Sequence, residues 1–159
     1  MIEIVIVLVV LLIVSAVVVS RYTTTGTHEL MVETDALKSS LRYAQTQSLK
    51  DDTIISSSAG GGIHFPNDTS YILYKNGSPA VDINGNPLMI PVKDPDPVKD
   101  PPPNNTHALQ GNVRITSGVG TTVAFDRWGS PGAATISITL QRGAENSTIT
   151  ITRNTGFIP

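Results

Sequence analysis

The chain has 159 residues, no cysteine, and a formal net charge of -2 with 11 basic residues. The lack of cysteine excludes disulfides and thiolate metal sites, so burial must supply the stability. So few basic residues argue against a general nucleic-acid surface, which needs a positive patch. Beyond its helical start the chain keeps about 110 residues, enough for one modest core.

Residues 1–20 are almost entirely apolar and form the first predicted element. Most of them are Ile or Val, and Glu3 carries their only charge. Such a run forms a poor helix in water, whereas in a bilayer a helix satisfies every backbone group internally. A helix over residues 4–19 rises about 24 Å, against a hydrocarbon layer of roughly 30 Å. It therefore spans the layer only if the first residues are included and the bilayer adapts.

Three interpretations of this segment are open: a signal peptide, a plain membrane anchor, and the assembly helix of a filament. A signal peptide has a basic start and a small-residue cleavage site, and neither is present before Arg21. A plain anchor tolerates Glu3 at its exposed end, near the positive end of the helix dipole. An assembly helix instead gives the Glu3 carboxylate a partner, such as the free amino group of a neighbouring subunit.

The sequence IEIVIV at residues 2–7, followed by an unbroken apolar run and Arg21-Tyr22, resembles the start of a type IV pilin or pseudopilin. The resemblance implies that a prepilin peptidase removes a leader and that the mature amino terminus is methylated, with Met1 as the candidate position. Glu3 and Tyr22 lie nearer the start than their family counterparts by the same offset, so their register agrees. The implied assembly residues are Glu3, Ile4, Val7, Leu8, Leu11, Ala16 and Tyr22.

Residues 21–52 are predicted to form a hinge and an amphipathic stalk helix. Residues 22–27 combine poor helix formers with a glycine, so we expect the helix to fray or melt there. From residue 28 to residue 50, apolar and small side chains recur at a three-to-four spacing that marks one helical face, which must meet a sheet. Glu33 and Arg42 are assigned to the polar face. The packed face consists of Leu30, Thr34, Leu37, Leu41, Ala44 and Ser48.

Residues 53–159 change to a period of two, which is typical of short strands. Strands are predicted at 53–56, 62–65, 71–74, 113–116, 122–125, 135–140 and 148–152. Asn76-Gly77 and Asn84-Gly85 are hairpin-turn dipeptides, with a further short strand between or beside them. The order predicts an α+β fold, in which a long N-terminal helical stalk, first transmembrane and then amphipathic, packs on an antiparallel β-sheet domain.

Residues 84–106 interrupt this domain with a stretch rich in Pro, Asp, Asn and Lys. The triplet Lys-Asp-Pro at residues 93–95 recurs at residues 99–101. Prolines lack a donor and restrict the residue before them, so the stretch is predicted to be an extended, polyproline-like surface insertion. It is either a subunit contact or recognition surface, or a solvated excursion without a specific role, and we favour the second.

The globular part, taken in order, narrows the resemblance to pseudopilins of the GspH/FimT type. The segments that carry it are residues 62–65, 71–74, 123–131 and 155–158. FimT-like competence proteins bind DNA through a basic C-terminal stretch, whereas residues 153–159 contain a single arginine, so that role is not transferred. Trp128 lies beside Gly129 and Pro131 at a turn, and we predict that it caps the core; a contact at a filament tip is the alternative.

No catalytic, cofactor or metal site is assigned. Asp82, Asn84 and Asn86 alternate like the start of a calcium loop, but Gly85 is misplaced and a closing glutamate is missing, so a hairpin turn explains them better. No nucleophile elbow or phosphate-binding glycine loop appears, which argues against an enzyme. The histidines lack metal-ligand spacing and are interpreted as surface or packed residues: His28, His64 and His107. Glycosylation triplets at Asn67, Asn76, Asn104 and Asn146 are interpreted as turns.

These features predict a structural subunit of a type IV pilus or type II secretion-like filament, assembled as a helical homo-oligomer. The subunit first spans the inner membrane once, is handled by the prepilin peptidase and the inner-membrane assembly machinery, and then lies in an extracellular or periplasmic filament. One alternative is a minor tip pseudopilin or a DNA-uptake pilin. The other is a membrane-anchored binding module that does not polymerise.

Overall fold

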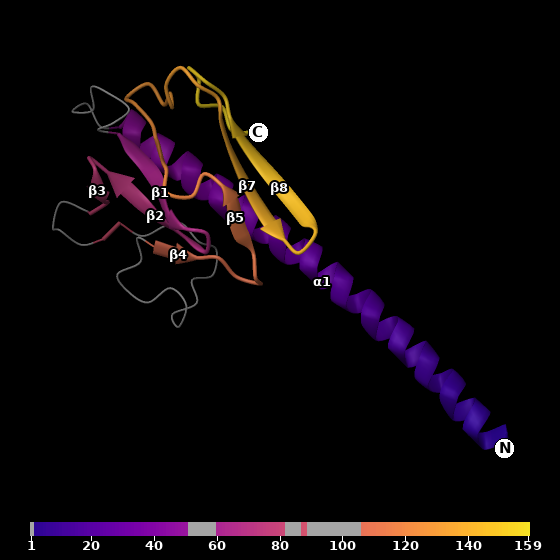
Figure 1. Ribbon diagram of the computed structural model, residues 1–159. Coiled ribbons are helices and arrows are strands. Elements are labelled where there is room, and N and C mark those ends of the chain that lie inside the picture. The colour runs from indigo at the N-terminus through magenta and orange to yellow at the C-terminus, as the bar shows by residue number, and fades with distance from the viewer. Residues whose placement is uncertain (1, 51–59, 82–86, 89–105) are drawn as a thin grey trace.

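One long helix and two antiparallel sheets make up the protein (Figure 1). The computed structural model describes residues 2–50, 60–81, 87–88 and 106–159, with the side chains of residues 2 and 16–26 outside that description. Helix α1 covers Ile2–Leu49, and its 48 residues rise about 72 Å at 1.5 Å per residue. The predicted α+β class is confirmed, with two sheets in place of one.

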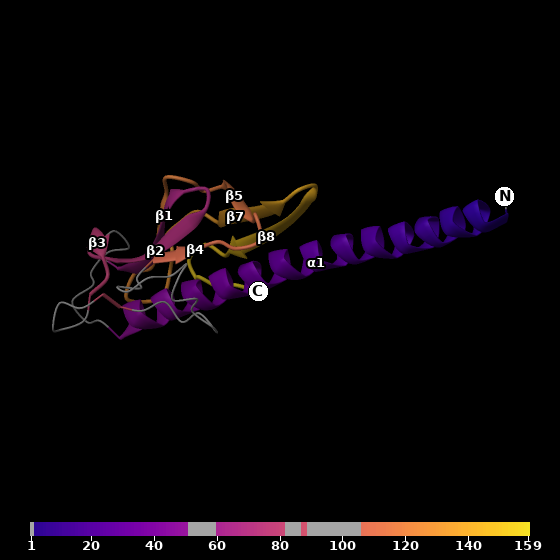
Figure 2. The same cartoon turned by 90° about the horizontal axis from the view of Figure 1, so that it is seen from below.

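The five-stranded sheet follows the order β3-β2-β1-β6, with β4 paired to β2 beside β3. The three-stranded sheet has the order β5-β7-β8. Both lie on one side of α1, and the β7–β8 hairpin reaches farthest toward the N-terminal end of the helix (Figure 2). The strands are β1 Gly61–Asn67, β2 Ser70–Lys75, β3 Ser78–Pro79, β4 Thr106–Ala108, β5 Arg114–Ser117, β6 Thr122–Ala124, β7 Ile136–Arg142 and β8 Glu145–Ile151.

The predicted packing face of α1 is confirmed, because all six of its residues are buried against the sheets. Small or apolar side chains at this spacing let the strands approach the helix closely. At Ser48 the approach is close enough for the backbone N–H of Gly61 to donate to Oγ at 2.8 Å. The buried residues of the face are Leu30, Thr34, Leu37, Leu41, Ala44 and Ser48.

The helix does not fray at residues 22–27, so the predicted break is wrong for the single chain. Each poor helix former there weakens the helix by at most about 1 kcal/mol. A break would instead expose the backbone donors and acceptors of two new helix ends, and any renewed helix would need a second nucleation. Residues 22–27 therefore remain helical, because the helix continues on both sides of them.

In both sheets, side chains that face the core alternate along the strands with side chains that face outward. In β1 and β2 the paired Ile63 and Leu73 face the core. Asn76 and Gly77, predicted as a hairpin turn, have φ values of 52° and 77°, and a type I′ turn requires positive φ at both of its central residues. In β7 and β8, isoleucines and leucine facing inward alternate with Thr or Ser facing outward. The predicted strands at 135–140 and 148–152 are thus confirmed.

The short strand β4 was not predicted. Its residues follow the Pro- and Asp-rich insertion without a clear alternating run, and pairing with Ser70, Tyr71 and Ile72 of β2 creates it. The strand predicted at residues 53–56, the dipeptide Asn84-Gly85 and nearly all of the insertion lie outside the described residues.

Candidate assembly surface

Residues 4–14 of α1, here called the apolar stem, project from the globular domain (Figure 1). Every side chain in the stem is apolar, and each keeps between 50% and 70% of its surface exposed. Ile4, Val7, Leu8 and Leu11 have the spacing i, i+3, i+4, i+7, so they form one stripe along the stem. The structure brings these four predicted assembly residues together on an uncovered surface.

The remaining predicted assembly residues are placed less fully. Glu3 lies in the first turn of α1, where its exposed carboxylate is near the positive end of the helix dipole. The side chains of Ala16 and Tyr22 and all of Met1 lie outside the described residues. Within the described part of the chain, no helix meets the length and apolarity needed to cross a membrane.

A buried hydrogen-bonded pair, Glu33 and His107, fastens β4 to the stalk. Glu33 and His107 are 5% and 2% exposed, and Nε2 of His107 lies 2.9 Å from Oε2 of Glu33. The other carboxylate oxygen accepts the backbone N–H of Gln110 at 3.2 Å. The assignment of Glu33 to an exposed polar face is therefore wrong. The Glu33 carboxylate lies next to the packed face of α1. Strand β4, which was not predicted from the sequence, covers it.

A second set of contacts fastens the stalk where the stem leaves the domain. Arg142 at the end of β7 lies 2.8 Å from the Glu29 carboxylate, and Thr27 Oγ1 donates to Glu145 at 2.8 Å. These pairs are partly exposed, so each contributes little energy. Their position at the tip of the β7–β8 hairpin nevertheless defines where the domain ends along α1.

Gln45 joins two loops at the other end of α1. Its Nε2 donates to the backbone oxygens of Gly129 at 2.8 Å and Gly156 at 3.1 Å. A Cβ on Gly156 would lie 1.9 Å from the Gly129 oxygen, and the φ of Gly156 is +64°. Glycine is thus required at this junction for two independent reasons.

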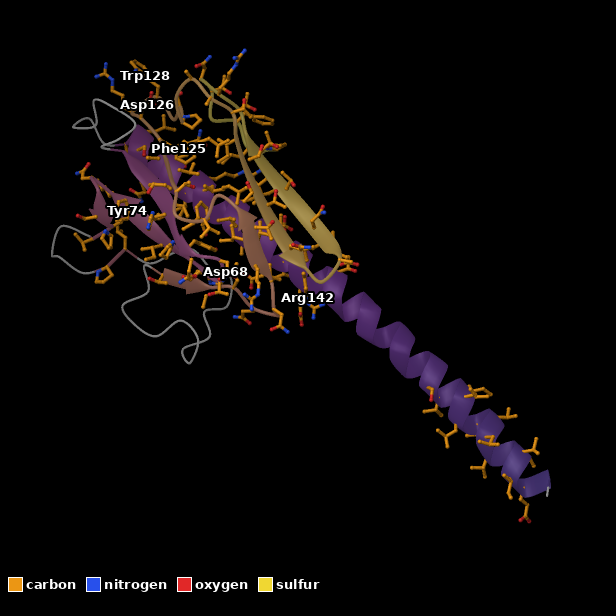
Figure 3. The ribbon with its side chains drawn as sticks, in the orientation of Figure 1. Asp68, Tyr74, Phe125, Asp126, Trp128 and Arg142 are labelled. Atoms are coloured by element: carbon orange, nitrogen blue, oxygen red, sulfur yellow. The ribbon has the colours of Figure 1, made fainter. Side chains whose placement is uncertain are left out.

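Trp128 does not cap the core, and this prediction is wrong. Its side chain is 73% exposed and points outward from the loop after β6 (Figure 3). Phe125 takes the core position instead, and Oδ1 of Asp126 accepts the backbone N–H groups of Trp128 and Ser130, closing a tight turn. The turn directs the indole away from the core. The exposed Phe157 was not predicted from the sequence, and an exposed Trp128 was considered there only as the alternative of a filament-tip contact.

Two of the three histidines have structural partners. His107 pairs with Glu33, and His64 Nδ1 lies 2.9 Å from Thr122 Oγ1, across the β1–β6 pairing. In the part of the chain that the structure describes, no three His, Cys, Asp or Glu side chains are grouped as metal ligands. The calcium-like residues 82–86 lie outside it.

A domain of two antiparallel sheets on one end of a long helix, with an uncovered apolar stem at the other end, defines the class of pilin-like subunits. The family described as type II transport protein GspH matches residues 33–156, so the chain belongs to this family. Its members are structural pseudopilins rather than enzymes. No curated protein and no solved structure matches the chain significantly.

Proposed function

We propose that the protein is a filament subunit of a type II secretion pseudopilus or a related pilus, held in the inner membrane by its apolar stem before assembly. The observation that carries the proposal is the exposed stem. Full burial of a Val, Leu or Ile side chain is worth about 1.5–3 kcal/mol. Over residues 4–14 the exposed surface therefore amounts to on the order of 10–20 kcal/mol, as large as the total stability of a typical domain.

Lipid and protein are the two environments that can cover such a stem. In lipid the helix satisfies its own backbone groups, and in a filament core the same side chains pack against neighbouring stems. Prepilin peptidase and the inner-membrane assembly machinery are the partners expected for this route, and the filament is then periplasmic or extracellular. A module that is anchored but never polymerises needs only the first environment.

Glu3 distinguishes a filament subunit from a plain anchor. In a filament core its carboxylate needs a positive partner, because a buried unpaired charge is strongly destabilising. We expect Glu3→Ala to leave the protein in the membrane fraction and to reduce filament growth sharply, measured by electron microscopy of sheared filaments. Asp35→Asn, at an exposed carboxylate on the same helix, is the control. Filaments of normal length and number from Glu3→Ala cells would refute the pairing.

Ala16 tests how the stems cohere. Moving an apolar helix from lipid into protein yields little hydrophobic gain, so close packing must supply the energy. We expect Ala16→Trp to impair polymerisation while membrane insertion stays intact, and Ala16→Ser, of similar volume, to polymerise normally. If Ala16→Trp cells assemble as wild type does, the anchor without polymerisation becomes the better proposal.

A minor subunit at the filament tip is the second candidate, favoured by the exposed Trp128 at the end of the domain remote from the stem (Figure 3). Quantitative mass spectrometry of purified filaments separates the two roles. A principal subunit accounts for most of the filament mass, whereas a tip subunit is present in very few copies per filament.

A further inference from the structure

Two exposed aromatic side chains are presented together at the end of the domain remote from the stem. Trp128 is 73% exposed on the loop after β6, and Phe157 is 63% exposed on the C-terminal segment after β8. Both loops meet at Gln45, which binds the backbone of each. We call Trp128, Phe157, Arg127 and Arg153 the distal aromatic surface. Large exposed aromatics on a folded domain mark binding sites more often than isolated aliphatic residues do.

The two loops hold this surface in a fixed shape before any partner arrives. Asp126 caps the Trp128 turn at 2.9 and 2.8 Å, and its own backbone N–H donates to the oxygen of Ser130. The second loop is closed by hydrogen bonds from Gly156 N–H to Thr152 and from Thr152 N–H to Phe157. A rigid aromatic surface loses little entropy when it binds.

The charge of the surface indicates an acidic partner. The Arg127 guanidinium lies 5.0 Å from the centre of the Trp128 ring, and Arg153 is exposed on the neighbouring loop. The nearby Asp126 carboxylate is engaged in its turn. Two arginines on a chain of net charge -2 are a poor match for the phosphate backbone of DNA. They match a short peptide in which carboxylates alternate with apolar groups.

We propose that the distal aromatic surface binds residues 94–103 of a second copy of this chain. That stretch reads DPDPVKDPPP, in which five prolines alternate with or follow three aspartates. Proline-rich peptides adopt a polyproline II conformation at low entropic cost and dock their rings on exposed aromatic side chains. Aspartates spaced among them can reach Arg127 and Arg153 by charge-assisted hydrogen bonds.

The topology favours contact between two copies. The insertion leaves the five-stranded sheet after Leu88, whose N–H donates to Ala80 beside β3, and returns as β4 on β2. The distal aromatic surface instead follows β6, at the opposite edge of the same sheet. The described residues that flank the insertion thus lie at one edge of the sheet and the surface at the other, so a contact between two copies would be heterologous, and such a contact can repeat along an open helical array. The inference thus rests on the proposed filament function and adds a contact between globular domains.

The single tryptophan allows a direct binding test. The full chain in detergent, kept unpolymerised, is titrated with a synthetic peptide of residues 92–103 while Trp128 emission is followed. We expect a saturable change in emission. A peptide with its prolines replaced by alanine and one with Asp→Asn changes should each bind roughly tenfold more weakly. Lack of saturation up to about 5 mM, or equal affinity for all three peptides, would overturn the proposal.

Variants of the chain locate the site through the anisotropy of a labelled peptide. Trp128→Ala and Arg127→Gln should each lower the affinity about fivefold to tenfold, because few residues dominate such contacts. Val119→Ala, at an apolar residue 44% exposed on another loop, should leave it unchanged. Displacement of the peptide by a duplex DNA oligonucleotide at lower concentration than by unlabelled peptide would contradict an acidic-peptide site. Because no filament is needed, failure here leaves the Glu3 result intact, and the reverse also holds.

Discussion

The Glu33–His107 pair offers the sharpest test of how the domain is held on its stalk. Both side chains are almost completely buried, and the carboxylate accepts hydrogen bonds from His107 and from the backbone of Gln110. Removing one partner of a buried pair costs about 3–5 kcal/mol. We expect Glu33→Ala to lower the free energy of unfolding by about 3 kcal/mol, the low end of that range. The loss is at the low end because the imidazole of His107, left without its partner, can take its neutral form.

Thermal unfolding of the full chain in detergent measures this effect, with the near-ultraviolet circular dichroism of the buried Tyr71 as a signal of native packing. The expected loss lowers Tm by roughly 10 °C or more, since 1 kcal/mol corresponds to about 4–8 °C in a domain of this size. Asp35→Ala, at an exposed carboxylate, should stay within about 0.5 kcal/mol of wild type. The reasoning is refuted if Glu33→Ala has the same Tm as the Asp35→Ala control. It is also refuted if the losses of unfolding free energy caused by Glu33→Ala and His107→Ala simply add in the double variant.

Three substitutions and one exchange measurement test other parts of the structure. Leu37→Ala, at a fully buried position, should lose about 2–5 kcal/mol in chemical denaturation, and a loss below 1 kcal/mol would contradict its core role. Trp128→Ser should change stability by less than about 0.5 kcal/mol, whereas a core cap would lose several. Gly156→Ala should lower Tm measurably, because a left-handed φ and a backbone clash coincide there. We also propose that residues 22–27 unwind when stems pack, so their amides should exchange faster in filaments than those of residues 30–41; equal protection would exclude this.

Local periodicity explains what the sequence predicted well. The packed face of α1 repeats every three to four residues, and β7 and β8 alternate strictly, so each side chain's burial follows from its neighbours in the chain. The turn at Asn76-Gly77 was equally local, because its two positive φ values depend on residue type. For the stem, the apolar run predicts a helix that needs lipid or other stems to cover it, and the assembly role of Ile4, Val7, Leu8 and Leu11 stays a prediction that follows from the resemblance.

The errors arise where distant segments meet. Glu33 reads as a surface residue until β4, more than seventy positions away, supplies His107. Trp128 reads as a core residue by its size, yet the Asp126 cap and the Gln45 contact fix a turn in which Phe125 fills the core. The Glu33 outcome has no signature within a window of the sequence, because it depends on which strand lies opposite; the Asp126 cap is local, but the Gln45 contact that holds the same loop comes from a distant helix.

The globular domain is held on α1 by contacts near both of its ends, so the position of the stem determines the position of the distal aromatic surface. Glu29 and Arg142 hold the domain where the stem leaves it, and Gln45 holds both loops of the surface near the other end of the same helix. If every stem packs in the same way, every domain repeats along the filament at the same height and rotation, whether or not residues 22–27 unwind. Neighbouring surfaces and insertions would then face each other at an effective concentration in the millimolar range. A peptide affinity of a few hundred micromolar is therefore enough to occupy the contact along a filament, while dilute subunits in the membrane would leave it mostly open.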